Sequence, residues 1–317
     1  MTMDLPKVSV LIPSYNQEHF IEQTLISSLT QDYENLEVVV TDDASTDNTP
    51  QILKELQIKY PRRLKVLLNQ ENLGVTKNHT RGLLQCGGDF IVFQDGDDLF
   101  LPNKIKKQVF IMLERPECTI CFHDVDVFNS ETGESLYLWS QRFGHREGGI
   151  RNLVRYGNYL PSVSIMVRRK DIPAYGYDDR IQIGSDWLLW LEVLSHGRGK
   201  MVYIDEVLAR YRRHTGNLTN KADWKFQDQH FTLDLIESKW PHLLFSARMR
   251  RSEVYFMQAL NSVSARSYGN VARHLLSSLL LGFPLFVPWI RLIAREIIFF
   301  LRYGNKNDDI LMSFISK

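Results

Sequence analysis

The sequence predicts an α/β fold with a mixed, mainly parallel central sheet, helices on both faces of the sheet, and a helical region at the end. Short β-branched runs alternate four times with segments of helical spacing in the N-terminal third. Polar or acidic clusters follow each of these runs, where a strand would end. From Phe226 onward only helical spacing remains. We therefore expect a domain at residues 1–222 and a helical region at residues 223–317.

The first half of this domain, residues 1–102, is the more regular. The expected strands are Val8–Ile12, Leu36–Val40, Leu64–Leu68 and Phe90–Phe93, and the expected helices are Glu18–Thr30, Gln51–Tyr60 and Val75–Gln85. Alternation at this spacing favours parallel strands joined by right-handed crossovers, which place helices on both faces of the sheet.

The second half, residues 103–222, alternates less clearly. The expected strands are Thr119–His123, Val125–Phe128, Ser162–Val167, Met201–Ile204 and Leu208–Arg212, and the expected helices are Glu147–Tyr156 and Gly184–His196. Ser185 or Asp186 is the natural N-cap of the second helix. A further helix is expected to start at Pro102.

Charge and composition exclude some classes of function. The chain has 317 residues, of which 44% are hydrophobic and 24% charged, as in ordinary globular proteins. A net charge of +1 argues against binding nucleic acid through broad phosphate neutralisation. Residues 240–317 hold 10 Lys/Arg and 4 Asp/Glu, a net charge of +6. The remaining 28 Lys/Arg and 33 Asp/Glu give residues 1–239 a net charge of −5. The tail is therefore basic and the body acidic.

The three cysteines, Cys86, Cys118 and Cys121, are too few for a disulfide framework in a chain of this size. Cys118 and Cys121 form a C-x-x-C that lacks the second pair of a zinc site, so we expect buried structural thiols. The first residues lack the features of a signal peptide. These observations favour a reducing cytoplasmic compartment.

The acidic run Asp95-Gly96-Asp97-Asp98 directly follows the fourth expected strand. Crowded carboxylates repel one another unless a cation shares them, and a hard divalent ion suits oxygen ligands. An acidic turn is the alternative. Ligands of open α/β sheets bind at the carboxyl ends of the strands, where Ser14–Asn16, Asp42–Asp43 and Asn69–Asn72 would also lie. This convergence favours a metal site.

Five motifs together carry a resemblance to a known family. They are Pro13-Ser14-Tyr15-Asn16, Asp42-Asp43-Ala44-Ser45-Thr46-Asp47, Asn72-Leu73-Gly74-Val75, Asp95-Gly96-Asp97-Asp98 and Ser185-Asp186-Trp187. In this order and spacing the chain resembles the family 2 glycosyltransferases with the GT-A fold, over about residues 7–215. The resemblance implies a GT-A catalytic domain with a nucleotide-binding half and an acceptor half. It also implies inverting transfer of a sugar from a nucleotide diphosphate donor, with Mn²⁺ or Mg²⁺ as the cofactor.

The resemblance also assigns roles to residues. The nucleotide-sugar would be bound by Pro13, Tyr15, Asn16, Asp42, Asp43, Asn72, Lys77, Asp95 and Gly96. Asp43 would bind the base and Tyr15 could stack on it, although a core aromatic is the alternative for Tyr15. A uracil imide suits a carboxylate, which points to a UDP-sugar. The chain departs from the family at Lys77–Arg81, and which of Lys77, His79 and Arg81 faces the diphosphate is open.

Asp97 would hold the metal, with His214 as a further ligand or else a surface histidine. A cation bridging the phosphates would stabilise the leaving group. Asp186 matches the general base that removes a proton from the acceptor hydroxyl. Trp187 and Ser164 are assigned to the acceptor side. Ser185 stands where many relatives have Glu, which leaves the assignment of the base intact.

The acceptor would be a glycan or a lipid-linked saccharide, and no nucleic acid partner is expected. A non-catalytic module that binds sugar nucleotides or glycans, and a nucleotidyltransferase, are the alternatives. Leu275–Ile290 is uncharged but too short to span a bilayer, and basic and aromatic residues follow. This tail could lie on the inner face of an anionic membrane, or pack on protein, including a second copy. The sequence does not identify the sugar, the linkage or the oligomeric state.

Overall fold

The computed structural model describes residues 5–218, 222–264, 266–282, 293–295 and 298. The chain forms two compact units. The first comprises residues 1–140, 145–150 and 160–214, and the second comprises residues 141–144, 151–159 and 215–317. The division after His214 lies near the expected boundary at residue 222, but two short segments of the expected acceptor half belong to the helical unit.

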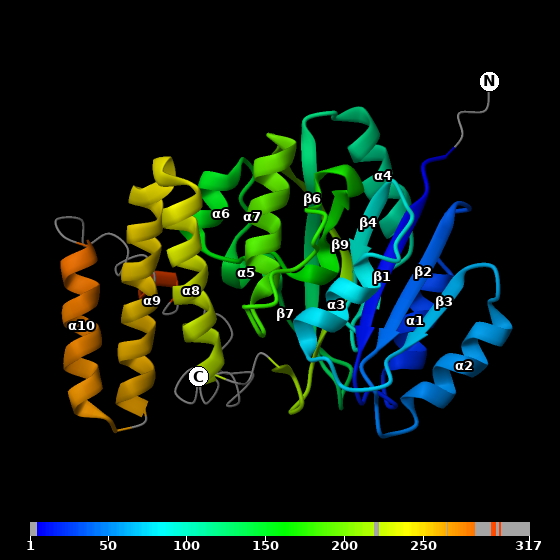
Figure 1. Ribbon diagram of the computed structural model, residues 1–317, viewed down its shortest axis with the longest axis horizontal. Helices are drawn as coiled ribbons and strands as arrows, with labels where there is room; N and C mark the ends of the chain where they lie inside the picture. Colours follow the sequence, from blue (N-terminus) through cyan, green and yellow to red (C-terminus); the bar gives the residue numbers. More distant parts are fainter. Residues whose placement is uncertain (1–4, 219–221, 265, 283–292, 296–297, 299–317) are drawn as a thin grey trace. The chain divides into compact units, whose positions relative to one another are not determined.

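The first unit contains a mixed sheet of nine strands in the described residues, in the order β3-β2-β1-β4-β8-β6-β9-β5, with β7 beside β6 (Figure 1). The strands are β1 Val8–Ser14, β2 Leu36–Asp42, β3 Leu64–Leu68, β4 Phe90–Phe93, β5 Leu99–Phe100, β6 Cys118–Asn129, β7 Ser135–Leu138, β8 Met166–Arg168 and β9 Lys200–Arg213. The predicted parallel arrangement of the first four strands is confirmed. Strand β8 runs antiparallel to β4, so the second half of the sheet is mixed.

Helices cover both faces of this sheet. They are α1 Ile21–Leu29, α2 Thr49–Lys59, α3 Val75–Leu83, α4 Lys104–Glu114 and α7 Ser185–Gly197. Buried side chains of α1, α2 and α4 form one core with the alternate residues Val8, Val10 and Ile12 of β1. The other face packs on α3 and α7, where Gly82 approaches Leu11 and Trp190 meets Phe93 edge to face. The period of two along β1 thus sends side chains into both cores.

The second half differs from the predictions in detail. Strands β6 and β9 are each continuous where two strands were predicted, because a β-bulge near His123 interrupts the alternation without ending the strand. The predicted strand Ser162–Val167 starts as a 3₁₀ turn over Ser162–Ser164 and becomes β8 only at Met166. The helix expected from Glu147 is α6 Ile150–Tyr156, because Gly148 pairs with Met201 instead. The three cysteines are buried and free, as predicted.

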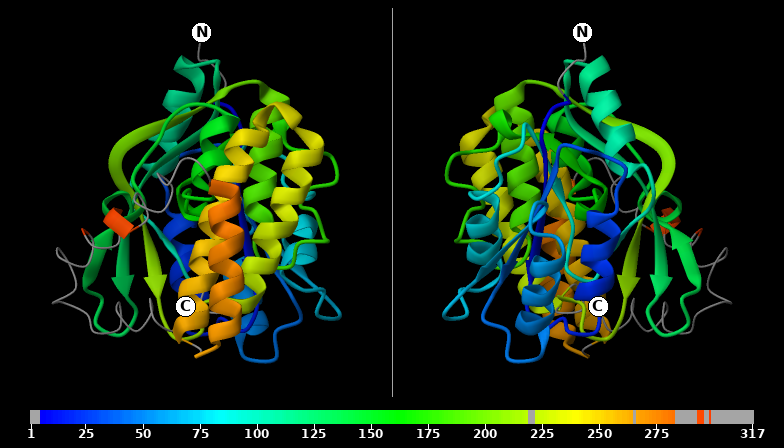
Figure 2. Two further views of the ribbon diagram at one scale, coloured as in Figure 1. Left: turned by 90° about the vertical axis from the view of Figure 1, so that its left-hand side faces the viewer. Right: turned by 90° about the vertical axis from the view of Figure 1, so that its right-hand side faces the viewer.

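The second unit is helical. It contains most of α5 Trp139–Phe143 and α6, together with α8 Ala222–Lys239, the 3₁₀ turn Pro241–Leu243, α9 Leu244–Ser264 and α10 Tyr268–Gly282. Helices α8, α9 and α10 lie side by side (Figure 2). None of the helices in the described ranges is long and apolar enough to cross a membrane. Most of the predicted basic and aromatic segment lies outside the described residues.

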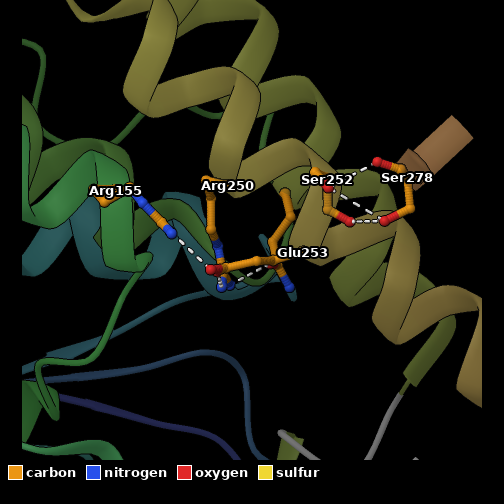
Figure 3. A network of polar contacts seen from close by, with 6 residues as sticks. Arg155, Arg250, Ser252, Glu253 and Ser278 are labelled. Atoms are coloured by element: carbon orange, nitrogen blue, oxygen red, sulfur yellow. Dashed lines mark hydrogen bonds and ion pairs between the residues drawn. The ribbon is translucent and has the colours of Figure 1, made fainter. Parts of the chain in front are cut away.

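A buried ionic network joins α6 to α9 inside this unit (Figure 3). The carboxylate of Glu253 is fully buried and lies 2.7 Å from Arg155 Nη1 and 3.2 Å from Arg250 Nη1. Directly before Glu253 in α9, the Ser252 hydroxyl donates to the Ser278 carbonyl of α10 over 2.8 Å. A buried carboxylate needs such partners, because desolvation strongly disfavours an isolated charge.

Candidate active site

The two acids after β2 organise the loops at the carboxyl edge of the sheet. Asp42 accepts hydrogen bonds from the Ser14 hydroxyl over 2.9 Å and from the Ser45 backbone over 2.9 Å. Asp43 accepts from the Asn69 amide over 2.8 Å and from the Leu73 and Gly74 backbones over 2.8 and 2.9 Å. Asn72 donates to the carbonyl of Asp43 over 3.1 Å. Both carboxylates are buried and shape this edge, and their contact with a nucleobase stays a prediction.

The loop after β1 presents an exposed aromatic side chain. Tyr15 is 48% exposed, which excludes the alternative of a core aromatic, while Pro13 before it is buried in β1. Asn16 takes a positive φ of 51°, and its side chain accepts a hydrogen bond from the Thr46 backbone over 2.8 Å. The tyrosine ring is therefore free to stack on a planar group, and its neighbour fixes the loop.

The acidic loop after β4 holds its three carboxylates in different environments. The side chain of Asp95 is 43% exposed, and its carboxylate accepts no hydrogen bond from any described residue. Desolvation, followed by the charges of Asp97 and Asp186, raises the pKa of Asp95 to about 7. Asp97 Oδ2 lies 2.8 Å from His214 Nε2. A Cβ atom at Gly96 would overlap the amide end of the Gln17 side chain, so a larger residue there would displace Gln17. Asp95 is thus the acid left open to a ligand.

Asp98 fixes β9 against this loop. Its Oδ1 atom accepts a hydrogen bond from the Arg212 backbone over 2.9 Å, while Oδ2 is buried without a partner in the described structure. Burial raises the pKa of Asp98 well above its usual range. The helix expected from Pro102 is α4, which starts after Asn103 with no side-chain cap, so Asp98 does not cap it. The Arg212 guanidinium donates to the Asp97 carbonyl over 2.7 Å. These contacts place His214 beside Asp97.

The pair Asp97–His214 fits a divalent cation that is only partly held by protein. Among the described residues no group of three or more His, Cys, Asp or Glu side chains could hold a metal ion. One carboxylate oxygen and one imidazole nitrogen suit Mn²⁺, and Mg²⁺ sites also commonly rely on one or two carboxylates plus substrate phosphates. The Oδ2 atom of Asp98, the next residue along the chain, is buried and has no hydrogen-bond partner in the described structure. Asp97 and His214 could therefore hold a divalent ion only together with further ligands, which a bound substrate or water would supply.

Helix α7 begins at the site, but with a different cap from the predicted one. Its N-cap is Gly184, and neither Ser185 nor Asp186 caps it. Ser185 instead lies 3.2 Å from the Thr76 hydroxyl of α3, which ties the two helices together. Asp186 accepts a hydrogen bond from the backbone of Trp187 over 2.9 Å. Its charge raises the pKa values of both Asp95 and Tyr177, so the three side chains share one electrostatic environment.

The two residues predicted on the acceptor side are buried. Trp187 is 3% exposed and Ser164 is fully buried. The Ser164 hydroxyl donates to the Pro161 carbonyl over 2.8 Å, and its own carbonyl accepts from Gln108 over 2.8 Å. In this structure neither side chain offers a surface to a sugar, because both serve packing.

Helix α3 distributes its polar side chains in three directions. Arg81 donates to Asn69, beside Asp43, and His79 Nε2 lies 4.0 Å from Asp95 Oδ1. Lys77 is exposed and forms no hydrogen bond or ion pair among the described residues. Of the three, His79 therefore faces the acidic loop.

Sequence reasoning missed three supporting residues: Asn78, Tyr177 and Arg212. Asn78 is buried and donates to the Thr41 carbonyl over 3.1 Å. Tyr177 packs on His79 with 5.3 Å between ring centroids. Arg212 could have been found as a charged residue inside an otherwise strand-like run.

Comparisons with known proteins agree with this architecture. Residues 9–172 match the glycosyl transferase family 2. An uncharacterized protein of Mycobacterium tuberculosis is 32% identical over 68% of this chain, and the aligned part spans 61% of that relative's length. The Escherichia coli UDP-Glc:alpha-D-GlcNAc-diphosphoundecaprenol beta-1,3-glucosyltransferase WfgD is 25% identical over 74% of this chain and 89% of its own.

Solved structures share the fold. Staphylococcus aureus TarS 1–349 in complex with UDP-GlcNAc superposes with a TM-score of 0.64 at 21% identity, over 86% of this chain and 79% of that chain. The mannosyltransferase PcManGT from Pyrobaculum calidifontis, in complex with GDP-Man and Mn²⁺, gives a TM-score of 0.59 at 16% identity, over 98% and 85%. At these identities the likeness supports the GT-A fold. With the family match over half of the sequence, it follows that the chain belongs to the glycosyl transferase family 2.

Proposed function

We propose that this protein is an inverting glycosyltransferase that moves a sugar from a nucleotide diphosphate donor, a UDP-sugar, to a hydroxyl of a glycan or lipid-linked acceptor. The observation that carries the proposal is that Asp43 and Asp95 closely follow the ends of β2 and β4 in one unit, where the charges of Asp97 and Asp186 act on Asp95. Ligands of open α/β sheets bind at such strand ends. TarS binds UDP-GlcNAc and WfgD is named as a UDP-Glc enzyme, which favours uridine.

The roles follow from the environments of the side chains. The exposed ring of Tyr15 stacks on the base near Asp43. Asp97 and His214 hold Mn²⁺ or Mg²⁺, whose charge stabilises the diphosphate leaving group. PcManGT, with the same fold, carries Mn²⁺ beside its nucleotide-sugar.

Asp186 acts as the general base. Inversion in a single displacement needs a carboxylate that removes the acceptor proton as the hydroxyl attacks C1 of the sugar. Asp186 stands at the start of α7, close enough to Asp95 to raise its pKa. Proton removal at this position leaves the nucleotide contacts untouched.

The decisive variant is therefore Asp186→Asn, measured with Mn²⁺ for product formation and for UDP binding. We expect turnover to fall by a factor of about 10² to 10⁴ while UDP affinity changes little, since general-base catalysis contributes about that factor. Product formation at the wild-type rate would contradict the assignment of the base. Loss of UDP binding in parallel would make Asp186 a nucleotide contact, and a wild type that binds UDP but forms no product would favour the alternative of a purely nucleotide-binding module.

The helical unit is proposed to contact an anionic membrane surface, which suits a lipid-linked acceptor. Helix α10 buries Ser278 and Gly282 against α9, whereas Leu276, Leu279 and Leu280 are exposed. The surrounding sequence carries a charge of +6 over residues 240–317. Apolar side chains combined with basic residues are what a membrane interface binds.

A further inference from the structure

We infer that Arg212 is a positioning residue for the pair Asp97–His214: its guanidinium fixes the acidic loop and the end of β9 to α1, so that the carboxylate and the imidazole can hold one cation together. The inference rests on the proposed function and deepens it, because it names a residue that acts on the proposed metal ligands without being one of them. Asp97 and Arg212 are 115 residues apart in the sequence, so only the fold brings them together.

Strand β9 places Arg212 and His214 on one side of the chain. Side chains alternate along an extended strand, so residues two apart point the same way. β9 ends at Arg213, and His214 follows it directly. Both side chains meet the same ring, since the centre of Phe20 lies 4.7 Å from that of His214 and 4.9 Å from Arg212 Cζ. A shift of Arg212 would therefore carry His214 with it.

The donors of Arg212 reach two elements that are far apart in the sequence. Nε donates to the Asp97 carbonyl over 2.7 Å, and Nη2 donates to Gln23 Oε1 of α1 over 2.7 Å. The backbone N–H of Arg212 donates to Asp98 Oδ1 over 2.9 Å. Because the contact with Asp97 is made to its backbone, it orients this residue while the carboxylate lies against His214.

The guanidinium also packs on a second aromatic ring. Arg212 Cζ lies 4.8 Å from the centre of Phe128, and the whole residue is only 5% exposed. A planar guanidinium stacks on rings and donates in several fixed directions, whereas the ammonium of lysine is a point charge on a flexible stem. The combination of two rings and two side-chain acceptors therefore calls for arginine.

The charge of Arg212 offsets the crowding of acids in the loop. Burial lowers the pKa of Arg212, and the negative charges of Asp97 and Asp98 oppose this shift. This attraction stabilises the acidic loop next to β9, since its three carboxylates would otherwise repel one another. Residues that orient metal ligands in this way typically change the affinity for the metal about 10- to 100-fold when they are replaced.

Binding of Mn²⁺ to the full chain with excess UDP tests the inference, and the electron paramagnetic resonance signal of free Mn²⁺ measures it. Arg212→Met removes the donors and the charge, and Arg212→Lys restores the charge. Arg210→Met is the matched control, because Arg210 lies on the same face of β9 and packs on Phe128 at 4.0 Å. Arg210 pairs with Asp126 over 2.7 Å, outside the acidic loop.

We expect Arg212→Met to bind Mn²⁺ about 10- to 100-fold more weakly than the wild type, and Arg212→Lys to lie between the two. Arg210→Met should bind Mn²⁺ like the wild type. A role of Arg212 in folding alone would lower the unfolding temperature of Arg212→Met and leave its affinity for Mn²⁺ unchanged. The affinity for Mn²⁺ therefore separates positioning from folding.

Wild-type affinity for Mn²⁺ in folded Arg212→Met overturns the inference and leaves the proposed function intact. An equal loss of affinity in Arg210→Met also overturns it, because the effect would then not depend on the contacts with Asp97 and α1. If the wild type binds no Mn²⁺ with UDP, GDP or dTDP, the proposed metal-dependent function fails, and the inference fails with it. If Arg212→Met does not fold, Arg212→Lys decides: weaker binding than in the wild type supports the inference, and equal binding overturns it.

Discussion

The fully buried Lys104 makes the stability of the first unit depend on pH. Its Nζ lies 2.5 Å from Gln108 Oε1 and 4.5 Å from the centre of the Phe100 ring. The titratable groups that interact with it electrostatically are Cys121 and His123, and neither supplies a negative charge at neutral pH. Burial therefore lowers the pKa of Lys104 from 10.5 to about 7. We predict that Lys104→Met removes this pH dependence.

The free energy of unfolding rises with pH because the folded protein binds fewer protons than the unfolded chain. Between about pH 7 and 10.5 the unfolded chain keeps the Lys104 proton and the folded protein releases it, so stability rises with pH in this window and falls on acidification. From pH 7 to pH 9 the folded lysine goes from half protonated to almost neutral. The free energy of unfolding then rises by about 2 kcal/mol from this group alone. Lys104→Met should be more stable than the wild type at pH 7, and its advantage should shrink by this amount by pH 9.

Urea unfolding at pH 7, 8 and 9, followed by tryptophan fluorescence, measures the difference between variant and wild type. Other titrating groups are common to both proteins and largely cancel in this comparison. Lys106→Met is the matched control, because Lys106 lies on the same helix and its side chain is 65% exposed. Parallel pH curves for Lys104→Met and wild type would refute the reasoning.

Two further predictions concern the helical unit. Glu253→Gln should raise amide exchange in α6 and α9 and cost about 3 kcal/mol, since it leaves two partly buried guanidinium groups without their carboxylate. Asp32→Asn, at an exposed ion pair, should cost less than about 1 kcal/mol. Equal exchange in Glu253→Gln and wild type would contradict this. The double variant Leu276→Glu, Leu280→Glu should co-sediment less with anionic vesicles than the wild type does. Leu113→Glu is the control, because Leu113 is a comparably exposed leucine of the first unit, and it should co-sediment like the wild type. Equal sedimentation of all three would remove the membrane proposal.

The sequence by itself determined the parallel half of the sheet and the place of its ligand edge. Strands such as β1 and β2 are continuous β-branched runs that carry their own signal, and the crossover rule arranges them in parallel. Acids that follow these strands, such as Asp43 and Asp97, must then gather at one edge. Local pattern therefore sufficed for the fold class and for most candidate residues.

Only the tertiary structure decided which side chains meet. Asp98 and Arg212 are separated by 114 residues, and their hydrogen bond depends on the register of β9, which no local pattern encodes. The rotation of α3 about its axis sends His79 to Asp95 and Arg81 to Asn69, a choice that composition left open. Burial of Trp187 and Ser164 likewise depends on how distant elements pack. Periodicity predicts the faces of elements, whereas the partners of each face depend on three-dimensional packing.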